Sequence, residues 1–174
     1  MMGKERLGVK LELQYKIDCS TKQFWKQYFD AEFTKKMHLE ALGSTSFDLV
    51  AQSGDTTGGL HRTLRYGQKP DMPGPVKKLF GTEVITTEVG EFDPGTGTWT
   101  FQLTPGTLAE KTEIRGTIRL DGKPASKTCN QLFTLEAKVR IFGVGPIVEK
   151  FIEAQARQTQ ERAAAFINSQ LSAK

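Results

Sequence analysis

The chain has 174 residues, of which 37% are hydrophobic and 25% are charged, and its formal net charge is +4. This length suits one domain with a buried core, so we expect a single domain over residues 1–174. Acidic and basic residues are interspersed, without the clustered basic and aromatic residues of a nucleic-acid-binding protein, so we expect no nucleic-acid partner. The sequence also lacks an apolar stretch of about 20 residues and a signal-peptide pattern, so we expect a soluble, cytoplasmic protein.

The residues that commonly carry chemistry do not form a recognisable motif. Cys19 and Cys129 match neither a zinc spacing nor a disulfide framework, and we expect two reduced, buried thiols. His38 and His61 also lack a metal-ligand spacing, so we interpret them as ordinary surface or satisfied residues. The segment 143–146 lacks the third glycine of a dinucleotide-binding loop, and no Gly-x-Ser-x-Gly motif occurs. We therefore expect no metal, no cofactor and no catalytic residue.

The first 43 residues predict a strand followed by two short helices. Apolar and polar residues alternate from Val9 to Ile17, which is typical of a strand with one exposed face. Ser20 stands three residues before Gln23 in a capping-box pattern, and aromatic residues then recur at helical spacing. A second helix is predicted from about Ala31 to Leu42, where Gly43 can end it.

The sequence from residue 44 to residue 142 has the pattern of strands and tight turns. Period-two alternation predicts six further strands, at about 47–51, 60–66, 84–92, 98–104, 112–120 and 129–141. The turn at 93–97 contains residues that accept unusual φ angles, and such hairpin connections imply an antiparallel sheet. The alternation assigns most carboxylates of this region to the exposed face, among them Glu83, Glu88, Glu91 and Glu113.

A long loop from Gly67 to Gly81 interrupts the strand pattern. It contains three prolines and predicts at most one helical turn, and loops of this length are often functional. We expect this loop to gate a cavity and to touch anionic membranes transiently, through Met72, Val76, Lys77, Lys78, Leu79 and Phe80. The alternative is that Leu79 and Phe80 fold back onto the open end of the sheet while the two lysines are solvated.

The last predicted element is a helix from Pro146 to Gln170, about 37 Å long at a rise of about 1.5 Å per residue. Its inner side is formed by Val148, Phe151, Ile152 and Phe166, and residues such as Glu149, Gln160 and Asn168 are assigned to the outer side. Between Ile152 and Phe166 the inner side is polar, with Gln155, Gln158, Thr159 and Arg162. Because burying an unpaired guanidinium is costly, we expect Arg162 to meet an anionic ligand group, a carboxylate or water. The alternative is that Arg162 is simply solvated.

This order of elements resembles the START-like (SRPBCC, helix-grip) superfamily over essentially the whole chain. In that α+β fold, a seven-stranded curved antiparallel sheet wraps around a long C-terminal helix, with two short helices between strands one and two. Phe24-Trp25, Ala41-Leu42-Gly43 and the amphipathic last helix look like a poorly characterised bacterial branch. The resemblance implies an elongated cavity that holds a hydrophobic ligand, and it implies no conserved catalytic set.

We therefore expect the protein to bind, and to transfer, a hydrophobic small molecule, with a lipid as the leading candidate. The predicted ligand-binding residues are Tyr66, Phe133, Leu135, Val148, Phe151, Ile152, Gln155, Gln158, Thr159 and Arg162. Two alternatives remain open. A cyclase or hydrolase using the same cavity would need an inward acid or base beyond Arg162, and an interaction module similar to co-chaperone members of the superfamily would have a filled core.

Overall fold

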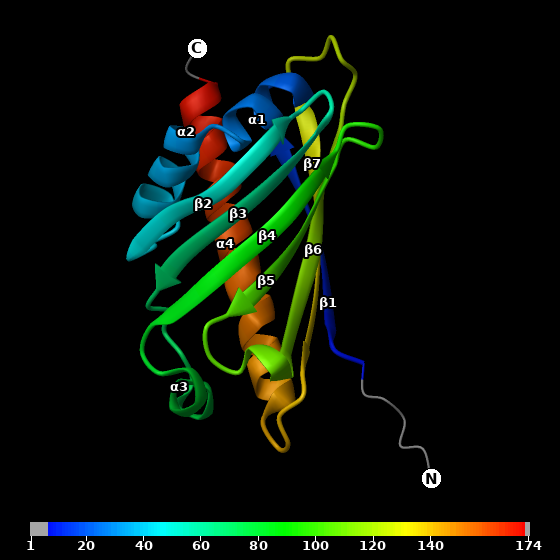
Figure 1. Cartoon of the computed structure of the whole chain (residues 1–174). Coiled ribbons are helices and arrows are strands. Elements are labelled where there is room, and N and C mark those ends of the chain that lie inside the picture. Colours follow the sequence, from blue (N-terminus) through cyan, green and yellow to red (C-terminus); the bar gives the residue numbers. More distant parts are fainter. Residues whose placement is uncertain (1–6, 173–174) are drawn as a thin grey trace.

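The computed structural model describes residues 7–172, in which a curved antiparallel sheet of seven strands wraps around one long helix (Figure 1). The strand order is β1-β7-β6-β5-β4-β3-β2, so β1 and β2 are the edges. This confirms the predicted fold class, including the two short helices between the first two strands. The elements are β1 (Val9–Ile17), α1 (Thr21–Tyr28), α2 (Ala31–Lys36), the π-helix η1 (Met37–Ala41), β2 (Ser46–Asp55), β3 (Gly59–Gln68), α3 (Gly74–Phe80), β4 (Val84–Asp93), β5 (Thr98–Pro105), the 3₁₀ turn η2 (Ala109–Lys111), β6 (Thr112–Asp121), β7 (Cys129–Val139) and α4 (Gly145–Leu171).

The helices after β1 begin at side-chain caps. The Ser20 hydroxyl accepts a hydrogen bond from the Gln23 N–H at 3.1 Å, as the capping-box pattern predicts. Asp30 caps α2 in the same way, accepting from the Phe33 N–H at 2.8 Å. The predicted second helix consists of α2 and η1, and Gly43, with φ of 71°, follows its end. Within η1, Met37 and His38 are buried.

The core lies between the concave face of the sheet and the helices. Inward side chains of β7 such as Phe133 and Leu135 are buried, and α4 packs mainly on β1 and β7. Cys19 and Cys129 are free, buried thiols, as expected. Within residues 7–172, no helix is long and apolar enough to cross a bilayer.

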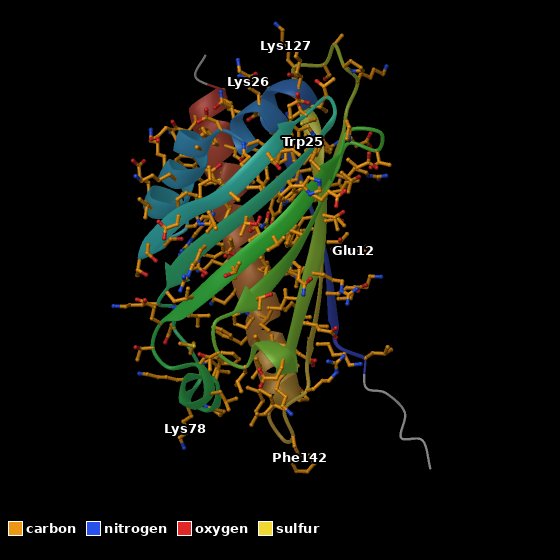
Figure 2. The ribbon with its side chains drawn as sticks, viewed as in Figure 1. Glu12, Trp25, Lys26, Lys78, Lys127 and Phe142 are labelled. Carbon is orange, nitrogen blue, oxygen red and sulfur yellow. The ribbon has the colours of Figure 1, made fainter. Side chains whose placement is uncertain are left out.

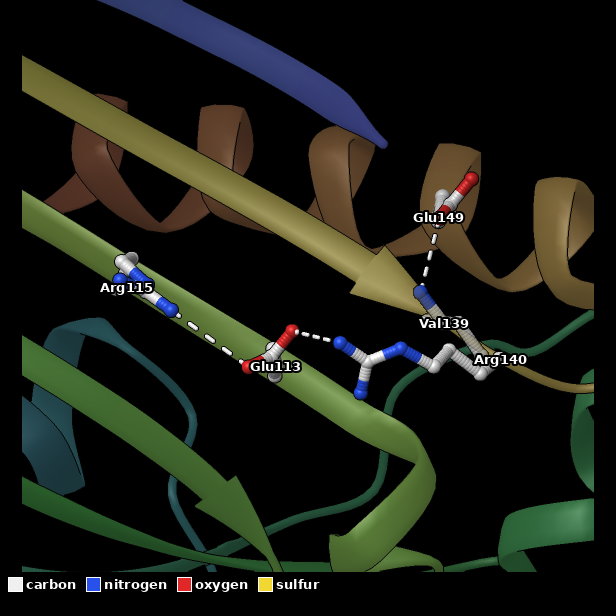
Figure 3. Close-up of polar contacts among 5 residues, drawn as sticks. All are labelled: Glu113, Arg115, Val139, Arg140 and Glu149. Carbon is white, nitrogen blue, oxygen red and sulfur yellow. Dashed lines mark hydrogen bonds and ion pairs between the residues drawn. The ribbon is translucent and has the colours of Figure 1, made fainter. Parts of the chain in front are cut away.

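Two polar side chains of α4 fix the helix on the sheet. Glu149 is 2% exposed, and its carboxylate accepts a hydrogen bond from the Val139 N–H at 2.9 Å at the end of β7 (Figure 3). At the other end of the helix, Asn168 accepts from the Asp18 N–H at 2.8 Å and donates to the Lys16 carbonyl at 3.0 Å. The predictions that Glu149 and Asn168 lie on the outer side of the helix are therefore wrong, and so is that for Gln160, whose Oε1 accepts from the Gln131 amide of β7 at 3.3 Å.

The outer face of the sheet carries solvent-exposed ion pairs. Glu113 lies 3.6 Å from Arg115 and 2.7 Å from Arg140 (Figure 3). All three side chains are more than a third exposed, so water and salt screen these pairs. They contribute little to stability, and the fold rests on the burial of the concave face.

Helix α3 closes the end of the molecule at which α4 begins (Figure 1). Its Val76 is 1% exposed and packs with Val139 and Val148, and further apolar side chains surround this cluster: Met72, Leu79, Phe80, Ile141, Phe151 and Ile152. Much of the loop predicted from Gly67 to Gly81 therefore folds as a short helix plugged into the open end of the sheet.

Candidate functional site

A cavity of about 200 Å³ lies between the concave face of the sheet and α4. A single water needs only about 10–15 Å³ by a comparable measure, so this space can hold a small organic molecule. Its lining is drawn from α1, η1, the strands β3 to β7, α3 and α4, and most of it is apolar. The apolar side chains that line it include Phe24, Phe101, Leu103, Ile114, Ile118, Phe133 and Leu135.

Most of the predicted ligand-binding residues line this cavity. Those that do are Tyr66, Phe133, Leu135, Val148, Phe151, Ile152, Gln155 and Thr159. Gln158 and Arg162 do not; both are exposed on the outer side of α4. The prediction that they form the polar end of the cavity is therefore wrong. Successive residues of a helix are rotated by about 100° around its axis. Ile152 and Ala163 therefore lie on the same, buried side of α4, and Arg162 lies outside that side.

The predicted gate residues divide into two groups. Met72, Val76 and Phe80 line the cavity, and Leu79 packs beside them, while Lys77 and Lys78 are exposed. The structure thus has the alternative arrangement, in which the apolar side chains fold inward. It contradicts the expectation that these apolar residues are available to enter a bilayer.

Glu88 also lines the cavity, although the sequence pattern predicts it on the exposed face. Side chains of a strand alternate between its two faces. Phe92 is buried on the concave face of β4, so Glu88, four residues before it, lies on the same face, whereas Val89 is 53% exposed on the outer face. The assignment of Glu88 to the exposed face was therefore wrong. The apolar Val89 suggested the opposite alternation, in which Val89 faces inward. The large apolar Phe92 was sufficient to indicate the correct one.

A buried arginine lies beside Glu88. Arg62 is 3% exposed, and its Nη1 donates to the Tyr28 carbonyl at 2.6 Å and lies 3.4 Å from the Thr34 hydroxyl. The centre of its guanidinium lies 4.8, 5.1 and 5.2 Å from the rings of Tyr28, Phe29 and Trp99. Aromatic faces attract a cation at such distances, so these rings hold the charge in place.

Arg62 and Glu88 are diagonal neighbours on the concave face, because Arg62 pairs with Gly90 and Leu64 pairs with Glu88. Burial raises the pKa of Glu88, while the Arg62 guanidinium and the Trp99 indole N–H oppose this rise. The indole N–H nevertheless has no hydrogen-bond partner among the described residues, and neither does Nε of Arg62.

The neutral polar groups near Glu88 are two tyrosines and a histidine. Burial, aided by the nearby Glu88, raises the pKa values of Tyr28 and Tyr66, so both hydroxyls stay protonated. His38 is 6% exposed; its Nδ1 lies 3.1 Å from the Ser44 hydroxyl, and its ring lies 4.6 Å from that of Tyr66. Burial, aided by Arg62, lowers the pKa of His38 to about 3, so the imidazole is neutral at pH 7.

His38 lies on η1, and short π-helical turns are frequent at functional sites. The histidine pattern in the sequence gave no sign of this position, because Tyr66, whose ring His38 contacts, is distant in the chain. Tyr28, His38, Tyr66 and Glu88 together form one polar patch of the cavity lining, which we call the Glu88 patch. Within residues 7–172, no group of three or more His, Cys, Asp or Glu side chains could hold a metal ion.

Residues 12–171 match a family model described as "Protein of unknown function (DUF2505)". No curated protein matches the sequence. Many solved structures share the fold, and at 10–16% identity the likeness concerns the fold alone.

A protein from Thermus thermophilus is 16% identical with a TM-score of 0.66, and the match covers 95% of this chain and 98% of that one. The Zhui aromatase/cyclase from a Streptomyces species is 10% identical with a TM-score of 0.66, covering 94% and 93%. A START superfamily protein from Mycobacterium smegmatis is 11% identical with a TM-score of 0.60, covering 94% and 97%. These matches confirm the predicted START-like fold.

Proposed function

Because the chain belongs to the DUF2505 family and has a START-like fold, we propose a function from its own cavity. The protein binds a hydrophobic small molecule, with a lipid chain as the leading candidate, between the sheet and α4. The observation that carries this proposal is the apolar cavity of about 200 Å³, since natural cores rarely leave such a volume empty. The cavity favours ligand binding over an interaction module with a filled core.

The proposal is tested by native mass spectrometry of the purified protein, followed by organic extraction. We expect a bound species that disappears on denaturation. Replacing Leu103, which lines the cavity, by Phe should reduce its occupancy, whereas Val89→Phe on the outer face should not. A protein that carries no ligand and gains no thermal stability from any hydrophobic probe would contradict the proposal.

Enzymatic activity is the second candidate. An enzyme using this cavity needs an inward acid or base, and Glu88 and His38 both line the cavity. A carboxyl group in an apolar site can act as a general acid or base. One of the similar structures is an aromatase/cyclase. Conversion of the extracted ligand by the native protein, but not by Glu88→Gln, would favour catalysis over carriage.

Transfer of a ligand requires an opening, and we place the gate at α3 and any membrane contact at the same end. Lys78 and the fully exposed Phe142 both lie at this end of the molecule (Figure 2). Each lysine near an anionic surface contributes on the order of 1 kcal/mol, so the contact is transient.

Reversing the charge at this end should therefore weaken membrane binding. We expect Lys77→Glu with Lys78→Glu to lower co-sedimentation with liposomes containing anionic lipid, at unchanged melting temperature, because both side chains are exposed. Lys26→Glu with Lys127→Glu makes the same change in net charge at the opposite end and is the control (Figure 2). Equal losses in the two double variants would indicate only a net-charge effect and contradict docking through α3.

A further inference from the structure

We propose that the Glu88 patch selects a neutral ligand bearing a hydroxyl group, such as an alcohol or phenol, and disfavours a carboxylate of the same shape. The hydroxyl donates to the carboxylate of Glu88, and the apolar body of the ligand lies along the aromatic and aliphatic wall. This inference rests on the proposed binding function and assigns the polar chemistry of its ligand.

The charges in and behind the patch already balance. Glu88 is the one carboxylate among the described residues that line the cavity, and the buried Arg62 beside it is the facing cation. An arginine keeps its proton, so its burial requires a compensating negative charge. The tyrosines and His38 are neutral, so the Glu88 patch together with Arg62 carries no net charge.

A ligand with its own charge would disturb this balance. A carboxylate would bring a second negative charge next to Glu88, and an ammonium group would bring a second positive charge near Arg62. In a water-poor cavity such a charge has little solvent to stabilise it. The exposed Arg162, expected from the sequence to receive an anion, is not available inside the cavity.

A hydroxyl group fits the hydrogen-bonding groups that remain. Arg62 directs Nη1 to the Tyr28 carbonyl and the Thr34 hydroxyl, while Glu88 lines the cavity and retains partial accessibility from it. An ionised carboxylate only accepts hydrogen bonds, and bonds to a charged acceptor are stronger than neutral ones. The phenol groups of Tyr28 and Tyr66 can donate in turn to the ligand oxygen.

The test compares probes of one shape on the unmodified protein at pH 7. Fluorescence titrations with naphthalene, 2-naphthol and 2-naphthoate vary only the polar group. We expect 2-naphthol to bind about tenfold more tightly than naphthalene, and 2-naphthoate to bind more weakly than naphthalene. In Glu88→Gln, the charge of Arg62 loses its compensation, so the preference should shift from 2-naphthol toward 2-naphthoate. Glu91→Gln, on the exposed face of the same strand, should keep the original order.

Each other outcome has a definite meaning. Equal binding of naphthalene and 2-naphthol, or tightest binding of 2-naphthoate to the native protein, overturns this inference but leaves hydrophobic binding intact. If none of the three probes binds to the unmodified protein, the proposed function fails together with the inference. The ligand order in the native protein decides the matter even if Glu88→Gln does not fold.

Discussion

Replacing Arg62 by Met should destabilise the protein by about 3 to 5 kcal/mol, because it removes one partner of a buried charge pair and leaves the other uncompensated. Arg62 is 3% exposed, and it contacts both the aromatic ring and the backbone carbonyl of Tyr28. Methionine fills much of the same volume, so the loss reflects mainly charge and hydrogen bonding. The measurement is urea unfolding followed by tryptophan fluorescence, since Trp99 lies 5.2 Å from the guanidinium.

A double-mutant cycle separates the charge pair from the packing of Arg62. If Arg62 and Glu88 compensate each other, Arg62→Met with Glu88→Gln should be less destabilised than the sum of the single variants, by at least about 1 kcal/mol. Arg65→Met, on the exposed face of the same strand, should change the free energy of unfolding by less than about 0.5 kcal/mol. Additive losses in the cycle would show that Glu88 is not the counter-charge.

The elements that the sequence predicted well are those set by local patterns. The strand from Val9 to Ile17 appears with these bounds because its alternation is uninterrupted, and Ser20 forms the predicted cap. The order of strands followed from short turns, and the START-like resemblance followed from that order. Local periodicity and turn chemistry therefore sufficed for the elements and the antiparallel sheet, and the START-like resemblance supplied how the sheet wraps around the helix.

The polar part of the site was harder to predict, because its residues depend on tertiary neighbours. Helix α4 has polar residues around much of its circumference, so its sequence did not fix which side faces the sheet. Glu149 is buried where its carboxylate accepts a hydrogen bond from the last N–H of β7, a partner that lies on another element. The position of Glu88 on the concave face can be predicted from its spacing to Phe92. Its importance, however, depends on Arg62, which lies on another strand.

The stability of the protein should fall as the pH drops below neutrality because of His38. Burial, together with Arg62, lowers its pKa from 6.5 to about 3. Between these values the unfolded chain binds a proton at this residue and the native protein does not, so acid favours unfolding. The contribution is absent above about pH 7 and grows by at most about 1.4 kcal/mol per pH unit below it. Between pH 7 and pH 5 we expect His38 to remove about 2 kcal/mol of stability.

Two variants isolate this contribution from the other titrating groups. His38→Gln removes the proton uptake and can keep a hydrogen bond to Ser44, so its loss of stability between pH 7 and pH 5 should be about 2 kcal/mol smaller than that of the native protein. His61→Gln, on the exposed face of β3, should lose as much as the native protein does. The measurement is urea unfolding at both pH values. If His38→Gln and the native protein lose the same stability, the folded protein takes up a proton at His38 as readily as the unfolded chain does, and the imidazole then adds a second cation beside Arg62 at pH 5.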